Sequence, residues 1–257
     1  MNQKKQILLL TATVTPPAGS RNLTRLDPRE RLDDYCRAFD FYLTLLDRSV
    51  DRIVFAENSA SDITPLRNMA ARRGAAGRVE FLSFYGLDYP PTYDRGYGEL
   101  KLVDYAAAHS AWIHDFAPDY ILWKVTGRYI IKNLDAIIAR QPADFDFYIN
   151  YRLGTATPVF PIRVLRWLDM WLFAWSHRAY QDFLQGIYAE FAYGMEDHFR
   201  QLIDRAPRHL KIVKRYRVVP EIEGVRGFDS RSYMNRSNRL KYRLRVAANR
   251  LAPWLWI

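Results

Sequence analysis

The chain has 257 residues, of which 49% are apolar and 15% aromatic, a composition that excludes a disordered protein and suffices for one large α/β domain. The net charge of +10 is uneven, because residues 226–257 hold eight Arg or Lys against one acid, Asp229, about +7, and we expect an anionic partner. The single cysteine, Cys36, excludes an internal disulfide, argues against a structural zinc site and favours the cytosol. The apolar run at 7–10 is too short for a signal peptide or a membrane span.

Strand and helix periods alternate along the first half of the chain. Residues 6–13 read as a buried strand that ends in a loop rich in Pro and Gly, and residues 29–46 carry the apolar spacing of one helical face. The later elements, in chain order, are a strand at 51–56, a helix at 63–73, a strand at 79–84, a helix at 98–116, a strand at 120–125, a helix at 130–140 and a strand at 146–150. This alternation predicts an α/β protein with a Rossmann-type mixed sheet flanked by helices.

The second half is less regular. The Trp-rich residues 165–175 fit neither period, whereas 179–192 and 196–203 read as helices and 210–219 as a strand or hairpin. Residues 237–251 predict a basic amphipathic helix. Its apolar face holds Leu240, Leu244, Ala247, Ala248 and Leu251. We therefore predict a catalytic domain over 1–225 and a basic amphipathic tail over 226–257.

The end of the strand at 120–125 is the most informative motif. It runs into Lys124, Thr126, Gly127 and Arg128, at the place where α/β proteins bind ligands. Two cations beside a glycine that permits close backbone approach suit a diphosphate. The alternative is that Lys124 and Arg128 are solvated charges beside an ordinary turn.

The ends of the first two strands form a second candidate site. Thr11 and Thr13 end the first, and Glu57 and Asn58 end the second. In a parallel sheet these ends are neighbours, so the carboxylate and amide could bind ribose hydroxyls and a base edge. They could equally be turn or cap residues.

A Gly-containing loop at 93–101 precedes a long predicted helix. Gly98 would let the loop approach a ligand, and the N-terminus of the following helix would contribute backbone amides to a phosphate. The fingerprints of a Walker loop and of a dinucleotide loop are absent. A simple turn also explains the pattern.

Two adjacent carboxylates, Glu196 and Asp197, follow Gly194 and precede His198. They suit a general base and an anchor for an acceptor sugar. Acids in the first turn of a helix are also favoured by the helix dipole alone.

This order of motifs resembles a GT-A glycosyltransferase, and the stretch from Lys124 to Tyr129 resembles bacterial glycosyltransferases of surface polysaccharide (O-antigen, capsule or lipopolysaccharide) synthesis. The resemblance covers about residues 6–205. It implies an inverting enzyme that moves a sugar from a nucleotide sugar to a lipid-linked polysaccharide or lipopolysaccharide. Glu196 or Asp197 would be the base, and Lys124 and Arg128 would bind the diphosphate together with Arg95 or Lys101.

The sequence departs from the GT-A pattern at the metal site. Most GT-A enzymes are similar in having Asp-x-Asp where this chain has Lys124 and Arg128. Cations can neutralise the diphosphate directly, so we expect no required metal cofactor. Asp144 and Asp146 are expected to cap or flank a strand and stay the alternative metal ligands.

The tail and the tryptophans suggest where an acceptor would bind. The basic helix, with Trp254 and Trp256, predicts peripheral attachment to the anionic inner face of the cytoplasmic membrane. Trp167, Trp171 and Trp175 are either core or a platform for sugar. Alternative functions are a basic nucleic-acid- or membrane-binding protein, with nucleic acid not favoured, and a metal-dependent nucleotidyltransferase.

Overall fold

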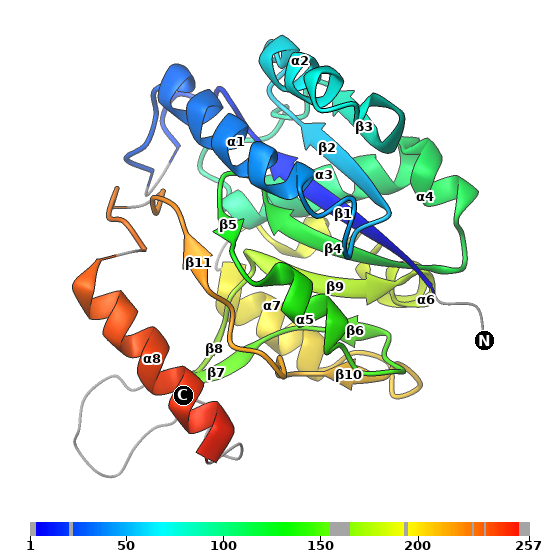
Figure 1. Ribbon diagram of the computed structural model, residues 1–257, viewed down its shortest axis with the longest axis vertical. Helices are drawn as coiled ribbons and strands as arrows, with labels where there is room; N and C mark the ends of the chain where they lie inside the picture. The colour runs from blue at the N-terminus through cyan, green and yellow to red at the C-terminus, as the bar shows by residue number, and fades with distance from the viewer. Residues whose placement is uncertain are drawn as a thin grey trace.

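The computed structural model describes residues 4–20, 23–154, 165–192, 195–227, 229–233 and 235–251. A seven-stranded mixed sheet, ordered β10-β6-β9-β4-β1-β2-β3, carries helices on both faces (Figure 1). Its strands are β1 (Lys5–Ala12), β2 (Arg52–Glu57), β3 (Val79–Ser83), β4 (Tyr120–Thr126), β6 (Phe147–Tyr148), β9 (Leu172–Ser176) and β10 (Ile212–Val213). The predicted α/β class and mixed sheet are confirmed.

The strand order places a topological switch beside β1. The chain runs from β1 to β2 and β3 on one side and then returns to β4 on the other, and Thr11 pairs in register with both Ala56 and Thr126. Both flanking strands are parallel to β1. A crevice that can take a ligand therefore forms at the carboxyl ends of β1 and β4.

The Trp-rich segment without an assignable period supplies a strand near the centre of the sheet. Strand β9 pairs antiparallel with β4 on one side and with β6 on the other. Each of its five residues is buried, so no alternation of polar and apolar residues marks it. This explains why the sequence pattern missed the strand.

Helices cover the two faces with separate apolar cores. One core holds α1 (Pro28–Leu43), α2 (Thr64–Arg72) and α5 (Leu134–Ala139). The other holds α3 (Arg95–His109), α4 (Ala111–Asp115), α6 (His177–Ala179) and α7 (Met195–Asp204). Successive residues of β1 alternate between the cores, with Leu8 in the first and Leu9 in the second, as the pleat of a strand requires.

Two predicted helices and one predicted strand differ from the structure. The helix expected at 98–116 starts earlier, behind the Asp94 cap, and breaks at Ser110, whose hydroxyl caps α4 and donates to Glu80. The helix expected at 179–192 is α6 followed by a π-helical turn at Tyr180–Leu184 and a 3-10 turn at Ile187–Glu190. Of the strand expected at 210–219, only β10 forms, parallel to β6. A further 3-10 turn spans Ala76–Arg78.

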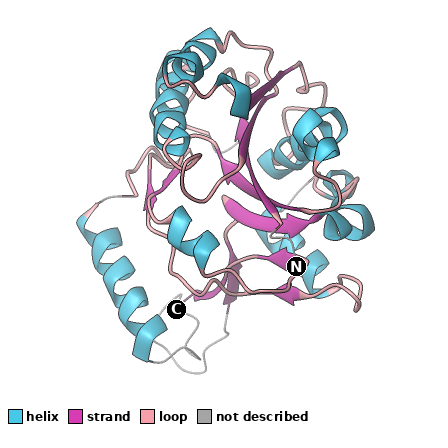
Figure 2. Ribbon diagram, turned by 45° about the vertical axis from the view of Figure 1, so that its right-hand side comes forward, coloured by secondary structure: helices cyan, strands magenta, loops and turns pink. Residues whose placement is uncertain are grey.

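The C-terminal part contacts the body through residues 222–227 and again through Asn249, which bonds to Arg215 and Arg217. Strand β11 (Ile222–Glu223) pairs with β5 (Ile130–Ile131), and β7 (Tyr151–Gly154) pairs with β8 (Leu165–Leu168). The amide of Thr24 donates to the carbonyl of Gly227 over 2.8 Å, so the predicted boundary at 225 falls within a packed turn. Helix α8 (Arg236–Leu251) lies at the periphery, apart from the helices on the sheet (Figure 2). Within the described ranges, the helices lack the length and apolar character needed to cross a bilayer.

Candidate active site

A cavity of about 210 Å³ opens at the switch between β1 and β4. Its walls come from the ends of both strands, the start of α1, the loop before α3, the turn before β9, the start of α7 and the segment after β11. The ionisable side chains on it are Arg31, Arg95, Arg128, Glu99, Glu196, Tyr35, Tyr89, Tyr129 and Tyr233. The structure therefore brings together parts that are far apart in the sequence.

Arg128 is the central cation of this cavity. Arg128 is only 6% exposed. Its guanidinium donates to the carbonyl of Val225 and to the hydroxyl of Tyr129, each over 2.7 Å. Among the described side chains, no carboxylate lies within ion-pair distance of it. A buried charge without a counter-charge is costly, so this site favours an anionic ligand.

Arg31 is a second cation of the same kind, and the sequence prediction missed it. It is 5% exposed, donates to the carbonyls of Thr13 and Arg25, and has no carboxylate partner in the described part of the chain. It shares a helical face with Tyr35 and Tyr42, both of which are buried. An arginine within an apolar helical stripe is the signal that could have identified it.

Lys124, which was predicted to bind phosphate, is instead committed to an internal ion pair. Its ammonium is fully buried, lies 2.5 Å from Oε1 of Glu99, and donates to the carbonyl of Met170. Burial lowers the pKa of Lys124. Lys124 does not line the cavity, whereas its partners Glu99, Thr126 and Met170 do.

Glu99 is the member of this pair that lines the cavity. Its Oε1 also accepts from the hydroxyls of Thr126 (2.8 Å) and Thr11 (3.0 Å). Burial acts to raise the pKa of Glu99, but Lys124 and these hydroxyls outweigh it, so the pKa lies below its ordinary value. The ion pair to Lys124 and both of these hydrogen bonds end on Oε1. Oε2 can therefore accept a hydrogen bond from a ligand.

The end of β2 is an organised turn. Glu57 is fully buried and accepts from the backbone amides of Val14, Ser59 and Ser61. Asn58 accepts from the hydroxyl of Thr13 over 2.7 Å. Neither Glu57 nor Asn58 lines the cavity, whereas Thr11 and Thr13 do. The alternative of a turn role fits Glu57 better than ribose binding, since its acceptor sites are occupied.

Of the three residues predicted to bind a ligand around the start of α3, two line the cavity. Arg95 and Gly98 line the cavity, but Lys101 does not and pairs with Asp88. A Cβ on Gly98 would lie 2.0 Å from the hydroxyl of Tyr89, so the glycine permits the packing of that ring. Burial raises the pKa of Tyr89 to about 12.

Gly127 serves the junction of the two strands. Its amide donates to the carbonyl of Thr11 over 2.8 Å, and a Cβ there would lie 2.9 Å from the same oxygen. The residue does not line the cavity. Its glycine is therefore explained by the close approach of β4 to β1, while Thr126 reaches the cavity wall.

The two acids at the start of α7 point in different directions. Glu196 lines the cavity, whereas the side chain of Asp197 is 82% exposed and its ion pair is a 3.9 Å contact to Arg200. His198 packs its ring on Phe191, with ring centres 5.6 Å apart. Gly194 lies outside the described residues. Of the two acids, Glu196 is therefore the one that a ligand in the cavity can reach.

The alternative metal ligands are used elsewhere. Asp146 is buried and accepts from Ser176, Arg178 and the amide of Lys211. Asp144 pairs with Lys211. The described His, Cys, Asp and Glu side chains form no cluster of three or more suited to a metal ion. The predicted structural role of Asp146 is consistent with these contacts.

The tryptophans also separate. Trp175 is buried in the second core, whereas Trp171 is partly exposed and lines the cavity. Trp167 belongs to β8, but its side chain lies outside the described ones, as do Trp254 and Trp256. Trp171 is thus the member of the predicted platform that the structure places at the site.

The sequence matches no family model and no curated protein. Solved structures similar to this chain include a protein assigned as a nucleotide-diphospho-sugar transferase from Desulfovibrio desulfuricans G20 (TM-score 0.46, 12% identity, 82% of this chain and 80% of that one). HddC from Yersinia pseudotuberculosis has a TM-score of 0.45 and 12% identity over 95% of this chain and 99% of its own. The galactosyltransferase LgtC, solved with donor and acceptor sugar analogues, has a TM-score of 0.45 and 10% identity over 77% and 69%. Similarity at these TM-scores carries no conclusion about the activity of this chain.

Proposed function

We propose that the protein transfers a sugar from a nucleoside-diphosphate sugar to a hydroxyl group of an acceptor glycan. The observation that carries this proposal is the pair of buried guanidinium groups, Arg31 and Arg128, which line one cavity without a carboxylate partner among the described residues. Guanidinium groups bind phosphate oxygens with two parallel hydrogen bonds. A diphosphate in the cavity would supply the missing negative charge.

The cavity also holds the groups that such a transfer needs. Glu196 would take the proton of the acceptor hydroxyl while its oxygen forms a bond to the anomeric carbon. The bond from that carbon to the diphosphate breaks, and its electron pair goes to the leaving oxygen, where Arg128 and Arg95 stabilise the charge. Attack opposite the leaving group inverts the anomeric centre.

Glu99 and the strand ends would position the donor. Oε2 of Glu99 would accept a hydrogen bond from a ribose or sugar hydroxyl, while Lys124 holds its other oxygen. The backbone near Thr11 and Thr13 would contact the base. Lys124 acts here through Glu99, which revises its predicted contact with the diphosphate. Roles for Lys101 and Asp197 stay predictions that their present contacts do not support.

Leaving-group stabilisation by guanidinium groups makes a divalent cation unnecessary. The carboxylates on the cavity are Glu99 and Glu196, and Glu99 is already bound to Lys124. This donor set fits a metal poorly, because a hard cation takes several oxygen ligands. Turnover that EDTA abolishes and Mg²⁺ or Mn²⁺ restores would contradict this part of the proposal and favour nucleotidyl transfer.

The test compares two reactions and two variants. Titration with UDP, GDP, dTDP and CMP identifies the base, and the matching nucleotide sugar is then assayed for release of nucleotide. Nucleotidyl transfer is assayed as pyrophosphate release from the triphosphate and a sugar 1-phosphate. Arg128→Met should reduce turnover about 100- to 1000-fold, since it removes a preorganised donor.

Arg140→Met is the matched control, because Arg140 is exposed at the end of α5 and does not line the cavity. It should keep wild-type turnover. Equal activity of Arg128→Met and the control would remove Arg128 from the site. Pyrophosphate release without nucleotide release would replace glycosyl by nucleotidyl transfer.

We further propose that α8 rests on an anionic membrane surface, which would bring the site to a lipid-linked acceptor. Leu240, Leu244 and Leu251 are exposed, and their spacing of four and seven residues puts them on one face. Arg236, Arg243 and Arg250 flank that stripe by helical spacing. Vesicles with phosphatidylglycerol should bind the protein more strongly than phosphatidylcholine vesicles, and Leu240→Ser/Leu244→Ser should remove the difference.

A further inference from the structure

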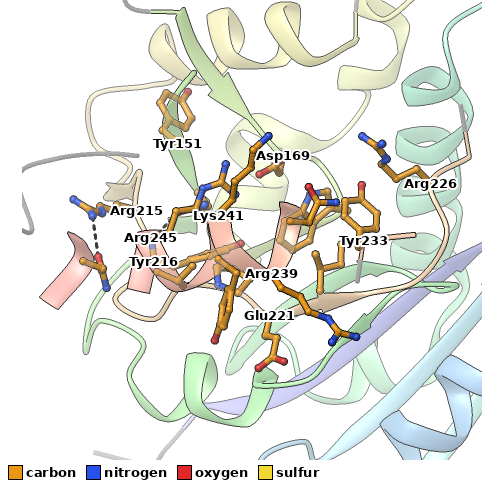
Figure 3. A pocket seen from close by; sticks show the side chains of 18 residues that line it. Tyr151, Asp169, Arg215, Tyr216, Glu221, Arg226, Tyr233, Arg239, Lys241 and Arg245 are labelled. Carbon is orange, nitrogen blue, oxygen red and sulfur yellow. Dashed lines mark hydrogen bonds between the residues drawn. The ribbon is translucent and has the colours of Figure 1, made fainter. Parts of the chain in front are cut away.

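A second cavity, of about 290 Å³, lies between α8 and the body of the protein (Figure 3). Lys241, Tyr242 and Arg245 line it from α8. Across from the helix, the body contributes Tyr151 and Tyr216. The sequence prediction assigned α8 to the membrane, with nucleic acid as the alternative, but the inward face of the helix lines a cavity.

The two cavities share residues. Trp171 and Tyr233 line both. The ring of Tyr233 packs edge-on against Tyr129, with ring centres 5.4 Å apart, and Tyr129 lines the first cavity. The two cavities are therefore adjacent, with Trp171 and Tyr233 in the wall of each.

The second cavity is lined by an excess of cations. Two carboxylates, Asp169 and Glu221, face it together with five cationic side chains. The cations are Arg215, Arg226, Arg239, Lys241 and Arg245. Arg226 forms an ion pair with Asp229 over 2.7 Å. The other four cations still exceed the two carboxylates on the cavity, which favours an anionic ligand.

The walls combine this charge with aromatic rings. Tyr151, Trp171, Tyr216, Tyr233 and Tyr242 are the aromatic members of the lining. Aromatic faces pack against the apolar C–H faces of sugar rings, and tyrosine hydroxyls can bond to sugar hydroxyls. Together, the rings and cations suit a sugar that carries an oxyanion.

We propose that this second cavity binds the acceptor glycan and recognises a phosphate or carboxylate group on it. The inference rests on the proposed transfer, because the shared residues Trp171 and Tyr233 place the acceptor beside the donor. The two faces of α8 then have different roles. The inward face binds the anionic acceptor, and the exposed leucines on the other face contact the membrane surface.

The test is a binding experiment on the full chain with soluble probes. Glucose 1-phosphate, glucuronic acid, glucose and inorganic phosphate are compared by ligand-observed NMR. Glucose 1-phosphate or glucuronic acid should bind more tightly than glucose and than inorganic phosphate. Whichever of the two binds more tightly shows whether the cavity prefers a phosphate or a carboxylate group. Lys241→Gln/Arg245→Gln should weaken that binding about tenfold or more, because it removes two charge-assisted contacts.

Arg243→Gln is the control, since helical spacing puts Arg243 outside the face that lines the cavity. The proposal would be overturned if glucose or inorganic phosphate bound as tightly as the charged sugars. It would also be overturned if Arg243→Gln weakened binding as much as Lys241→Gln/Arg245→Gln does. Binding of single-stranded RNA that is lost in Lys241→Gln/Arg245→Gln would also overturn it, in favour of a nucleic-acid site.

A nucleotide titration of the same variants separates the two proposals. Lys241→Gln/Arg245→Gln should bind the preferred nucleotide as the wild type does, because neither residue lines the first cavity. If the wild type binds the nucleotide but does not bind the sugar phosphate or glucuronic acid, only the proposal for the second cavity is refuted. If the wild type binds none of the nucleotides, the proposed function is refuted.

Discussion

Lys124 and Arg128 lie four residues apart at the end of β4, and both are buried. Lys124 has a complete set of internal partners in Glu99, Thr126 and Met170. Arg128 donates to a carbonyl and a hydroxyl but meets no described carboxylate. The first is thus part of the fold, and the second carries charge that a ligand can neutralise.

Internal charge compensation separates structural from ligand-binding charges at a strand end. Glu57, at the end of β2, resembles Lys124, because its oxygens already accept from backbone amides. A charge with full internal compensation should affect stability when it is removed. A charge without such compensation should affect binding instead.

Lys124→Met should produce the largest loss of stability. It leaves the buried Glu99 without its cation, and breaking a buried ion pair on one side costs about 3–5 kcal/mol in the free energy of unfolding. Urea denaturation measures the loss. Lys124→Met/Glu99→Gln should be less destabilised than the single variant, and a double variant that is worse would contradict the pairing.

Glu57→Gln should follow with a loss of about 2–3 kcal/mol. The amide is uncharged, so the hydrogen bonds from Val14 and Ser59 lose their charge-assisted strength. Urea denaturation again gives the value. Nucleotide binding by the fraction that stays folded should be unchanged, and a selective loss of binding would return Glu57 to the ligand site.

Asp146→Asn tests a third internal charge by its pH dependence. Burial raises the pKa of Asp146, but Arg178, the amide of Lys211 and Ser176 lower it more, to a net value below the ordinary 3.8. The native state therefore binds fewer protons than the unfolded state, so the stabilisation is complete above about pH 4 and is lost as the pH falls through the native pKa.

We expect Asp146→Asn to be less stable than the wild type by about 2 kcal/mol at pH 7. The difference should shrink steadily below pH 4 in unfolding experiments. A difference that stays constant down to pH 2 would show that the charge of Asp146 does not stabilise the native state.

Arg128→Met should have the smallest effect on stability, a change of less than about 1 kcal/mol. Removing an uncompensated buried charge offsets the lost hydrogen bonds to Val225 and Tyr129. Thermal unfolding without ligand measures it, alongside the expected loss of turnover. A loss comparable to that of Lys124→Met would make Arg128 a structural residue.

Local patterns predicted much of this fold. The helix α1, the buried strands β1 and β4 and the basic helix α8 follow from short-range sequence. The strand β9 did not, because burial on both faces removes its alternation. The break at Ser110 depends on Glu80, which lies 30 residues away.

For the site, the sequence by itself determined which strand ends carry polar and charged residues, because parallel strands place their carboxyl ends together. Only the tertiary structure decided which of those charges a ligand can reach. Glu99 meets Lys124 across 25 residues, and Arg31 reaches the cavity from α1. Such contacts depend on packing between distant segments, so spacing along the chain could not distinguish Lys124 from Arg128.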